Sequence, residues 1–201
     1  NGNVGLYGKS YEGATQWEAA LSGNPYLKTI VPISGTTSTK TLLFKNGSAE
    51  ARSQVMHGAY FINIVDFDES DTEHVCPDVA DGFTRGERTY LEPRVDPDLN
   101  YWNERDYRQR SIDNYQGSVY FVQGLQDWNV DSHMIFPLYQ QMKDAGFDVK
   151  GIFGQWGHDY PDQWQKHDDI DKDNGGTAFP QMTRWDWAQD LFEWFEYYLQ
   201  N

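Results

Sequence analysis

Short apolar runs and amphipathic stretches alternate at the start of the chain. Residues 4–7 and 29–34 are short and apolar, and residues 12–22 between them have helical spacing and end before Gly23-Asn24-Pro25. A strand, a helix and a second strand of these lengths predict a β-α-β unit. Such units build parallel sheets, in which catalytic groups collect at the carboxyl ends of the strands.

The same alternation returns in the last part of the chain. Residues 118–123 and 149–153 are predicted strands. The stretch 132–145 between them is amphipathic, ends before Gly146, and carries three apolar residues on one face: Ile135, Leu138 and Met142. Residues 184–199 predict a final helix whose apolar stripe packs against the sheet, formed by Trp187, Ala188, Leu191, Phe192, Phe195 and Leu199.

Between these regions the pattern loosens into a polar, aspartate-rich stretch that is interrupted by prolines, at residues 38–114. Helical pieces are predicted within it only around 49–61 and 102–110. We therefore predict an α/β fold whose core is made by residues 1–37 and 115–201, with a helical cap insertion between these two parts.

The composition narrows the classes of partner. The formal charge of −15, from 31 acidic against 16 basic residues, argues against nucleic-acid binding, because that requires clustered lysines and arginines. No apolar run approaches the roughly 18 consecutive residues that a transmembrane helix needs, so no membrane partner is expected. The compartment stays open between cytoplasm and secretion.

Two features could suggest metal or redox chemistry, and neither fits its template. Cys76 is the single cysteine, so it cannot form an internal disulfide, and its neighbours offer no positive charge that would make it reactive. The acidic stretch 168–175 resembles a calcium loop, but Asn174 stands where the glycine is required and Pro180 where the bidentate glutamate is required. We expect no metal and no cofactor.

The motif with the clearest chemistry is Gly8-Lys9-Ser10-Tyr11-Glu12-Gly13, directly after the first apolar run. It has the form of a nucleophile turn, in which a serine lies on a strained bend between a strand and a helix and small residues flank it. The second glycine comes one residue later than in the common G-x-S-x-G form. A phosphate-binding loop is excluded, because Asn3 stands where its first glycine is required. Taken alone, the motif could still be an ordinary loop.

A serine nucleophile needs a base and a carboxylate that orients the base, and in α/β-hydrolases these follow in the order Ser, Asp, His. Asp127 follows the predicted strand 118–123, and His158 follows the strand 149–153, so both stand at strand exits. The other histidines lie in the cap, at a helix start or in a charged loop: His57, His74, His133 and His167. Order and placement predict a catalytic triad of Ser10, Asp127 and His158.

These motifs resemble those of the Xaa-Pro dipeptidyl-peptidases and their relatives, the cocaine-esterase-like and α-amino-acid ester hydrolases, which share a Gly-x-Ser-Tyr-x-Gly turn. The motif at 8–13 fits that form, which accounts for the late glycine. Further matches are Tyr101-Trp102-x-Glu104-Arg105-Asp106-Tyr107-Arg108, then Gly124-Leu125-Gln126-Asp127-Trp128-Asn129-Val130, and then Gly157-His158. The resemblance implies an α/β-hydrolase fold, of which this chain holds the carboxyl-terminal part of the parallel sheet with a helical cap insertion.

The resemblance also implies the role of each residue in the reaction. Ser10 would be the nucleophile, Asp127 the orienting acid and His158 the base. The backbone N–H of Tyr11 would be one donor to the oxyanion. No cofactor takes part in this chemistry.

Three residues after the acid would contact the substrate, by the same resemblance. Asn129 matches a position that in the peptidases helps to hold the free amino terminus of the substrate. Trp128 and Val130 would neighbour the pocket that accepts proline. For these two side chains, ordinary packing beside the acid turn stays open as an alternative.

The chain departs from the family in three respects. It begins at the strand before the nucleophile, so the earlier strands and a tyrosine that completes the oxyanion hole lie outside it. It also ends after Leu199, where family members continue into a β-rich domain. Aromatic residues that line the peptidase pocket are replaced by residues 38–43. We therefore expect the remainder of the same protein as a partner, and a homo-oligomer is left open.

The expected function is that of a serine hydrolase that releases Xaa-Pro dipeptides, through an acyl-enzyme, from a peptide substrate with a free amino terminus. One rival keeps the triad and changes the substrate to esters or amides of small acids or amino acids. A more distant rival is a non-catalytic module in which the fold serves as an interaction surface.

Overall fold

The computed structural model of the chain describes four ranges of residues: 2–45, 48–49, 103–163 and 183–200. Two compact units are present, one formed by Asn1–Ser38 with Asp106–Asn201 and the other by Thr39–Arg105. The described residues of the second unit include the helix α2, Thr39–Leu43, and a two-stranded antiparallel sheet. Its strands are β3, Phe44–Lys45, and β4, Ser48–Ala49.

Several predictions concern residues outside these ranges. The expected helix at 49–61, Cys76, three of the competing histidines (His57, His74 and His167) and the acidic stretch 168–175 all lie there. The cap insertion at 38–114 therefore stays a prediction.

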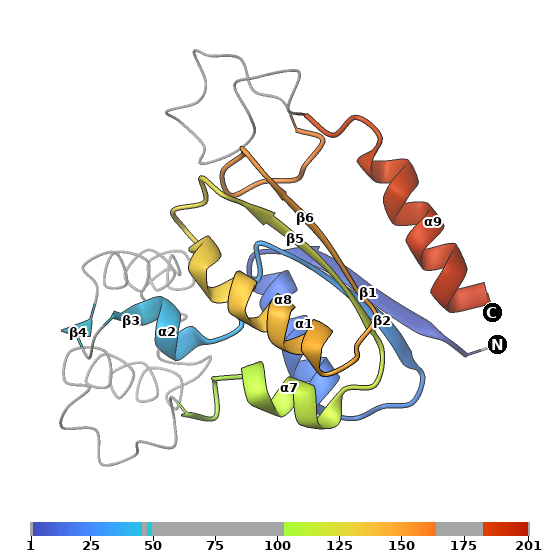
Figure 1. The fold of residues 1–201 in the computed structure, drawn as a ribbon, viewed down its shortest axis with the longest axis horizontal. Coiled ribbons are helices and arrows are strands. Elements are labelled where there is room, and N and C mark those ends of the chain that lie inside the picture. Colours follow the sequence, from blue (N-terminus) through green and yellow to red (C-terminus); the bar gives the residue numbers. More distant parts are fainter. Residues whose placement is uncertain (1, 46–47, 50–102, 164–182, 201) are drawn as a thin grey trace, which may run out of the picture. The chain divides into compact units, whose positions relative to one another are not determined.

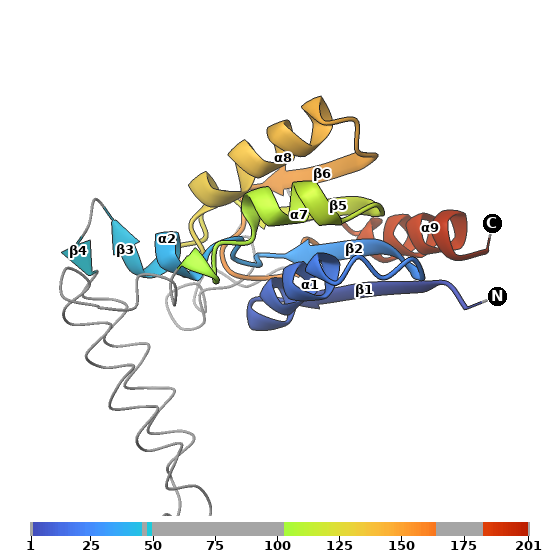
Figure 2. The same ribbon diagram turned by 90° about the horizontal axis from the view of Figure 1, so that it is seen from below.

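A four-stranded parallel sheet forms the centre of the first unit, with the strand order β1-β2-β5-β6. Figure 2 shows the strands stacked in this order. Their bounds are Val4–Lys9, Leu27–Ile33, Ser118–Gly124 and Val149–Gly154. Lys9 is in register with Ile33, and Ile33 with Val122, so the strands end at one common edge.

Helices cover both faces of this sheet, as Figure 1 shows. On one side lie α1, α7 and α8, with the bounds Tyr11–Leu21, Arg108–Asn114 and Ile135–Asp144. A short 3-10 helix, η1 (Ser132–Met134), leads into α8. The helix α9, Trp187–Gln200, covers the other side. Among the described residues, no helix has the length and apolar character to cross a membrane.

The alternation of side chains along the strands explains the two layers. Val119 and Phe121 of β5 point into the core beneath α1 and α8, whereas Tyr120 and Val122 point into the core beneath α9. Every residue of β5 is buried. A strand that is covered on both faces is apolar throughout rather than alternating, which is why the sequence shows plain apolar runs here.

The structure confirms the parallel α/β arrangement and changes two details of the helices. Of the helix expected around 102–110, residue 103 and residues 108–110 are helical, residues 104–107 are not, and α7 continues from Arg108 to Asn114. On α9, Ala188 and Phe192 are predicted in the stripe that packs on the sheet, but both are exposed, Phe192 by 56%. Trp194 packs there instead and donates a hydrogen bond of 2.7 Å from Nε1 to Thr29 Oγ1. Positions 188 and 192 lie beside the packed face of α9, whose residues follow the i, i+4, i+7, i+8 spacing of one helix face: Trp187, Leu191, Trp194 and Phe195.

Candidate active site

The turn between β1 and α1 consists of Ser10 alone, with the backbone angles φ 62° and ψ −120°. A positive φ in a residue with a Cβ is strained, and nucleophile turns show this strain because it lifts the serine side chain out of the sheet edge. The turn is held by two backbone hydrogen bonds. The Ser10 N–H donates to the Ile33 carbonyl at 2.9 Å, and the Ala14 N–H donates to the Ser10 carbonyl at 3.0 Å.

Close packing explains both glycines of the motif. A Cβ on Gly8 would lie 2.7 Å from the Cβ of Glu12, and a Cβ on Gly13 would lie 2.9 Å from the Cα of Gly35. Real Cβ atoms do not approach other atoms so closely, so neither position accepts a side chain without a shift of the backbone. The late glycine at 13 is therefore required where α1 crosses the exit of β2.

Gln16 supports the same turn from inside α1, and sequence reasoning missed it. Its side-chain amide Nε2 donates to the carbonyls of Glu12 at 3.1 Å and Gly8 at 3.4 Å, while Oε1 accepts from the N–H of Val31 at 2.9 Å. The side chain is buried and joins α1 to both β1 and β2. The available signal was a glutamine on the apolar face of a helix, where a polar side chain needs partners.

Asp127 lies in the turn after β5 and is almost fully buried. Its Oδ1 accepts hydrogen bonds from the N–H groups of Asn129 and Val130, both at 2.9 Å. Its Oδ2 accepts from Nε2 of Gln123 at 3.2 Å. Gln123, also missed from the sequence, further donates to the Val130 carbonyl at 2.9 Å. The carboxylate is thus fixed in orientation before any substrate arrives.

His158 lies in the loop after β6, is 8% exposed, and places Nδ1 2.9 Å from Asp127 Oδ2. With Nδ1–H donating to the carboxylate, the neutral ring keeps its lone pair on Nε2, where a general base needs it. The structure therefore brings two of the three expected triad residues into contact.

The structure links His158 to the nucleophile turn through Lys9, the residue before Ser10. Lys9 Nζ donates to the backbone carbonyl of His158 at 3.2 Å. Within the described residues no hydrogen bond joins Ser10 to His158 directly. In free enzymes such hydrogen bonds are often long, and they shorten when substrate binds.

The other expected site residues surround this centre in different ways. Tyr11 is the first residue of α1, so its backbone N–H has no partner within the helix. Trp128 is 52% exposed, whereas Val130 is buried. The side-chain oxygen of Asn129 is buried and has no hydrogen-bond partner among the described residues. His133 lies exposed on η1, away from these contacts.

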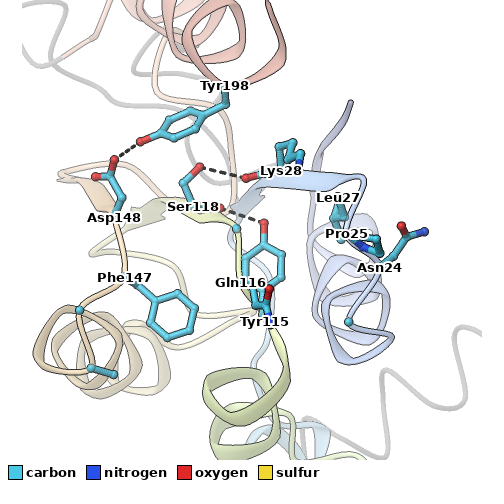
Figure 3. A pocket seen from close by; sticks show the side chains of 14 residues that line it. Asn24, Pro25, Leu27, Lys28, Tyr115, Gln116, Ser118, Phe147, Asp148 and Tyr198 are labelled. Carbon is cyan, nitrogen blue, oxygen red and sulfur yellow. Dashed lines mark hydrogen bonds between the residues drawn. The ribbon is translucent and has the colours of Figure 1, made fainter. Parts of the chain in front are cut away.

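The described residues contain no group of three or more His, Cys, Asp or Glu side chains placed to hold a metal ion. They do contain a cavity of about 520 Å³ at the opposite edge of the sheet, where β2, β5 and β6 begin. Figure 3 shows its lining, which includes Lys28, Tyr115, Asp148 and Tyr198. The candidate triad lies at the carboxyl edge, so this cavity is not part of it.

The chain has clear relatives among known proteins. It is 28% identical to the Xaa-Pro dipeptidyl-peptidase of Ligilactobacillus salivarius over 178 residues, and 25% identical to that of Lactiplantibacillus plantarum over 190 residues. Each alignment covers 87% of this chain and 22% of the relative. The chain covers 29% of the relatives from Rhodopirellula baltica and Bacillus anthracis, so it spans less than a third of these proteins.

A solved structure of an α-amino acid ester hydrolase matches with a TM-score of 0.58 and 18% identity, over 99% of this chain and 34% of that one. At this identity the likeness shows the fold, which is that of the α/β-hydrolases. The model of the X-Pro dipeptidyl-peptidase (S15) family matches residues 1–160. Because that match spans most of the sequence, the chain belongs to the X-Pro dipeptidyl-peptidase family of serine peptidases.

Proposed function

We propose that this chain carries the catalytic centre of a serine hydrolase that releases Xaa-Pro dipeptides from the amino termini of peptides. The observation that carries the proposal is the contact of 2.9 Å between His158 Nδ1 and Asp127 Oδ2, made by loops that leave two neighbouring strands. The strained turn at Ser10 and the family of the chain support it further.

Acylation begins when His158 Nε2 takes the hydroxyl proton of Ser10, and the serine oxygen attacks the carbonyl carbon of the substrate's proline residue. Asp127 stabilises the imidazolium that forms and keeps its proton on Nδ1 directed at Oδ2. The four hydrogen bonds that Asp127 accepts hold it in this orientation. The imidazolium then gives the Nε2 proton to the leaving amine, which departs as the shortened peptide.

The tetrahedral intermediate needs donors for its oxyanion. The N–H of Tyr11 is suited to this role, because it lies at the amino-terminal end of α1, where the helix dipole favours negative charge. A second donor is expected from a tyrosine outside this chain. Deacylation repeats the steps with water, which His158 activates, and releases the dipeptide.

Recognition of the amino terminus is assigned to Asn129. Its buried Oδ1 lacks a partner within the described ranges of the chain, and a buried acceptor without a donor is costly, so a protonated amine from the substrate would supply a hydrogen bond. The formal charge of −15 favours the approach of a cationic amine. Trp128, half exposed beside Asn129, offers an apolar surface to the proline ring.

Labelling with a fluorophosphonate tests the nucleophile in the full-length protein. We expect wild type to be labelled, Ser10→Ala to lose all labelling, and the matched variant Ser22→Ala, which changes an exposed serine at the other end of α1, to be labelled like wild type. Absence of labelling in wild type would favour the non-catalytic module over an enzyme.

Paired substrates test the peptidase assignment. A Gly-Pro anilide should be cleaved with a higher kcat/KM than a short acyl ester, and blocking its amino group should reduce cleavage. Asn129→Ala should raise KM for the free anilide roughly tenfold, the typical effect of one charge-assisted hydrogen bond, and leave the ester unaffected. Faster hydrolysis of the ester, insensitive to Asn129, would favour the ester and amide hydrolases instead.

A further inference from the structure

Lys9 contacts three consecutive residues of the loop that carries the candidate base. Its Nζ donates to the His158 carbonyl at 3.2 Å, lies 3.5 Å from Asp159 Oδ1, and lies 5.4 Å from the centre of the Tyr160 ring. Lys9 is also the last residue of β1 and is bonded directly to Ser10. One side chain thus joins the loop of the base to the turn of the nucleophile.

The sheet order shows why such a connection matters. β1 and β6 are separated by β2 and β5, and neighbouring strands lie roughly 4.8 Å apart, so the exits of β1 and β6 are separated by about 14 Å. The loop after β6 must therefore return across the carboxyl edge to bring His158 toward Ser10. The hydrogen bond between His158 and Asp127 fixes the loop to β5 only, whereas Lys9 fixes it to β1.

Burial and charge make this contact more than a surface ion pair. The Asp159 side chain is 11% exposed and that of Lys9 is 28% exposed. A carboxylate with so little access to water requires a counter-charge, and a hydrogen bond from an ammonium group is stronger than one from a neutral donor. Asp159 Oδ1 also accepts the N–H of Tyr160 at 2.8 Å, which keeps the carboxylate directed at Lys9.

We propose that Lys9 is a positioning residue that holds the His158 loop over the nucleophile turn, with Asp159 as its counter-charge. The inference deepens the proposed function and rests on it, because it assigns His158 as the base for Ser10. Its essential contact is the hydrogen bond to the His158 carbonyl, which sets the distance between the two reacting side chains.

Three variants of the full-length protein distinguish positioning of His158 by Lys9 from a general contribution of Lys9 to the stability of the fold. Lys9→Met removes the hydrogen bond but leaves Asp159 without a counter-charge, whereas Lys9→Met combined with Asp159→Asn removes the bond and the unpaired charge together. Lys9→Arg keeps a cationic donor. Lys143→Met changes an exposed lysine on α8 and serves as the matched control.

We expect the double variant to lower kcat per active site by about 10- to 100-fold with KM within about threefold of wild type, since a shift of about 1 Å in a catalytic group has effects of this size. The second-order rate of fluorophosphonate labelling at Ser10 should fall in parallel. Lys9→Arg should restore both to within about fivefold, and Lys143→Met should match wild type.

Several results would overturn the inference. A double variant with wild-type kcat and labelling rate would show that the hydrogen bond from Lys9 does not position His158, and that any loss in Lys9→Met comes from the charge of Asp159. If fewer active sites were labelled by the fluorophosphonate but kcat per labelled site were unchanged, Lys9 would have a role in stability only. If wild type is labelled at Ser10 but does not cleave Xaa-Pro substrates, the labelling rates still decide about Lys9. If wild type is not labelled at all, the proposed function and this inference fail together.

Discussion

The two edges of the central sheet differ in which type of residue has a positive φ angle. Before the strands, positive φ occurs at Gly23 and Gly146, at 60° and 86°. After the strands it occurs at Ser10 and Ser34, at 62° and 46°. Glycine adopts this conformation readily, whereas a residue with a Cβ is destabilised by about 1–3 kcal/mol. Backbone strain among the described residues is therefore concentrated at the edge that holds the candidate triad.

The two edges also differ in how many of their buried polar groups have hydrogen-bond partners. At the amino edge, the Tyr115 hydroxyl donates to the Ser118 carbonyl at 3.1 Å and the Tyr198 hydroxyl donates to Asp148. Burial raises the pKa of Tyr115, so this hydroxyl stays protonated. At the carboxyl edge, Asn129 Oδ1 and Ser34 Oγ are buried without partners among the described residues. The two tyrosine hydroxyls at the amino edge thus have partners, whereas the carboxyl edge has described groups that a ligand can satisfy.

The largest expected difference between the edges is in catalysis. Asp127→Asn should lower kcat about 10⁴-fold, because an amide in place of the carboxylate favours the wrong tautomer of His158. Asp148→Asn is the matched change at the amino edge and should leave kcat within about twofold. Steady-state hydrolysis of the preferred substrate by the full-length protein measures both effects.

Circular dichroism should show that both asparagine variants are folded. A similar loss of activity in Asp148→Asn would remove the distinction between the edges, because it would place the cavity of the amino edge within the catalytic machinery.

A smaller effect is expected where α1 crosses the exit of β2. Gly13→Ala adds a Cβ 2.9 Å from the Cα of Gly35, and overpacking of this kind typically destabilises a fold by about 1–3 kcal/mol. The thermal midpoint of unfolding should fall, and fluorophosphonate labelling at Ser10 should slow because the turn moves with α1. Thr15→Ala, an exposed change on the same helix, should do neither. An unchanged midpoint in Gly13→Ala would mean that the late glycine is not required by packing.

The sequence predicted the elements of the first unit and the approximate place of each candidate residue. Apolar runs located the strands, and residues that follow strands in a parallel sheet gather at one edge, so Asp127 and His158 could be expected near each other. The structure places them in contact. The fold is confirmed, while the catalytic roles stay predictions that the experiments above test.

Contacts between distant polar side chains could not be predicted from the sequence. Lys9 and His158 are 149 residues apart, and nothing in a lysine between Gly8 and Ser10 indicates which loop its ammonium will reach. The hydrogen bonds of Gln16 and Gln123 could not be predicted for a related reason. Hydrophobic periodicity indicates which positions are apolar, but it does not indicate which buried polar groups form hydrogen bonds with each other. The spacing of Gly13 was visible, but its cause, Gly35, lies on another element.

The smallest expected effect tests the backbone strain directly. Ser10→Gly and Ser10→Ala both lose the hydroxyl and hence the activity, but only glycine relieves the positive φ, so Ser10→Gly should be more stable than Ser10→Ala by about 1 kcal/mol. At the amino edge the native residue is already glycine, so the same preference appears as a loss of stability on substitution. Gly146→Ala should be less stable than wild type by about 1 kcal/mol, and its added Cβ meets no atom within 4 Å, so the change reports the backbone alone. Urea unfolding midpoints measure all three variants. If Ser10→Gly were no more stable than Ser10→Ala, the nucleophile turn would hold no strain energy and this contrast between the edges would be lost.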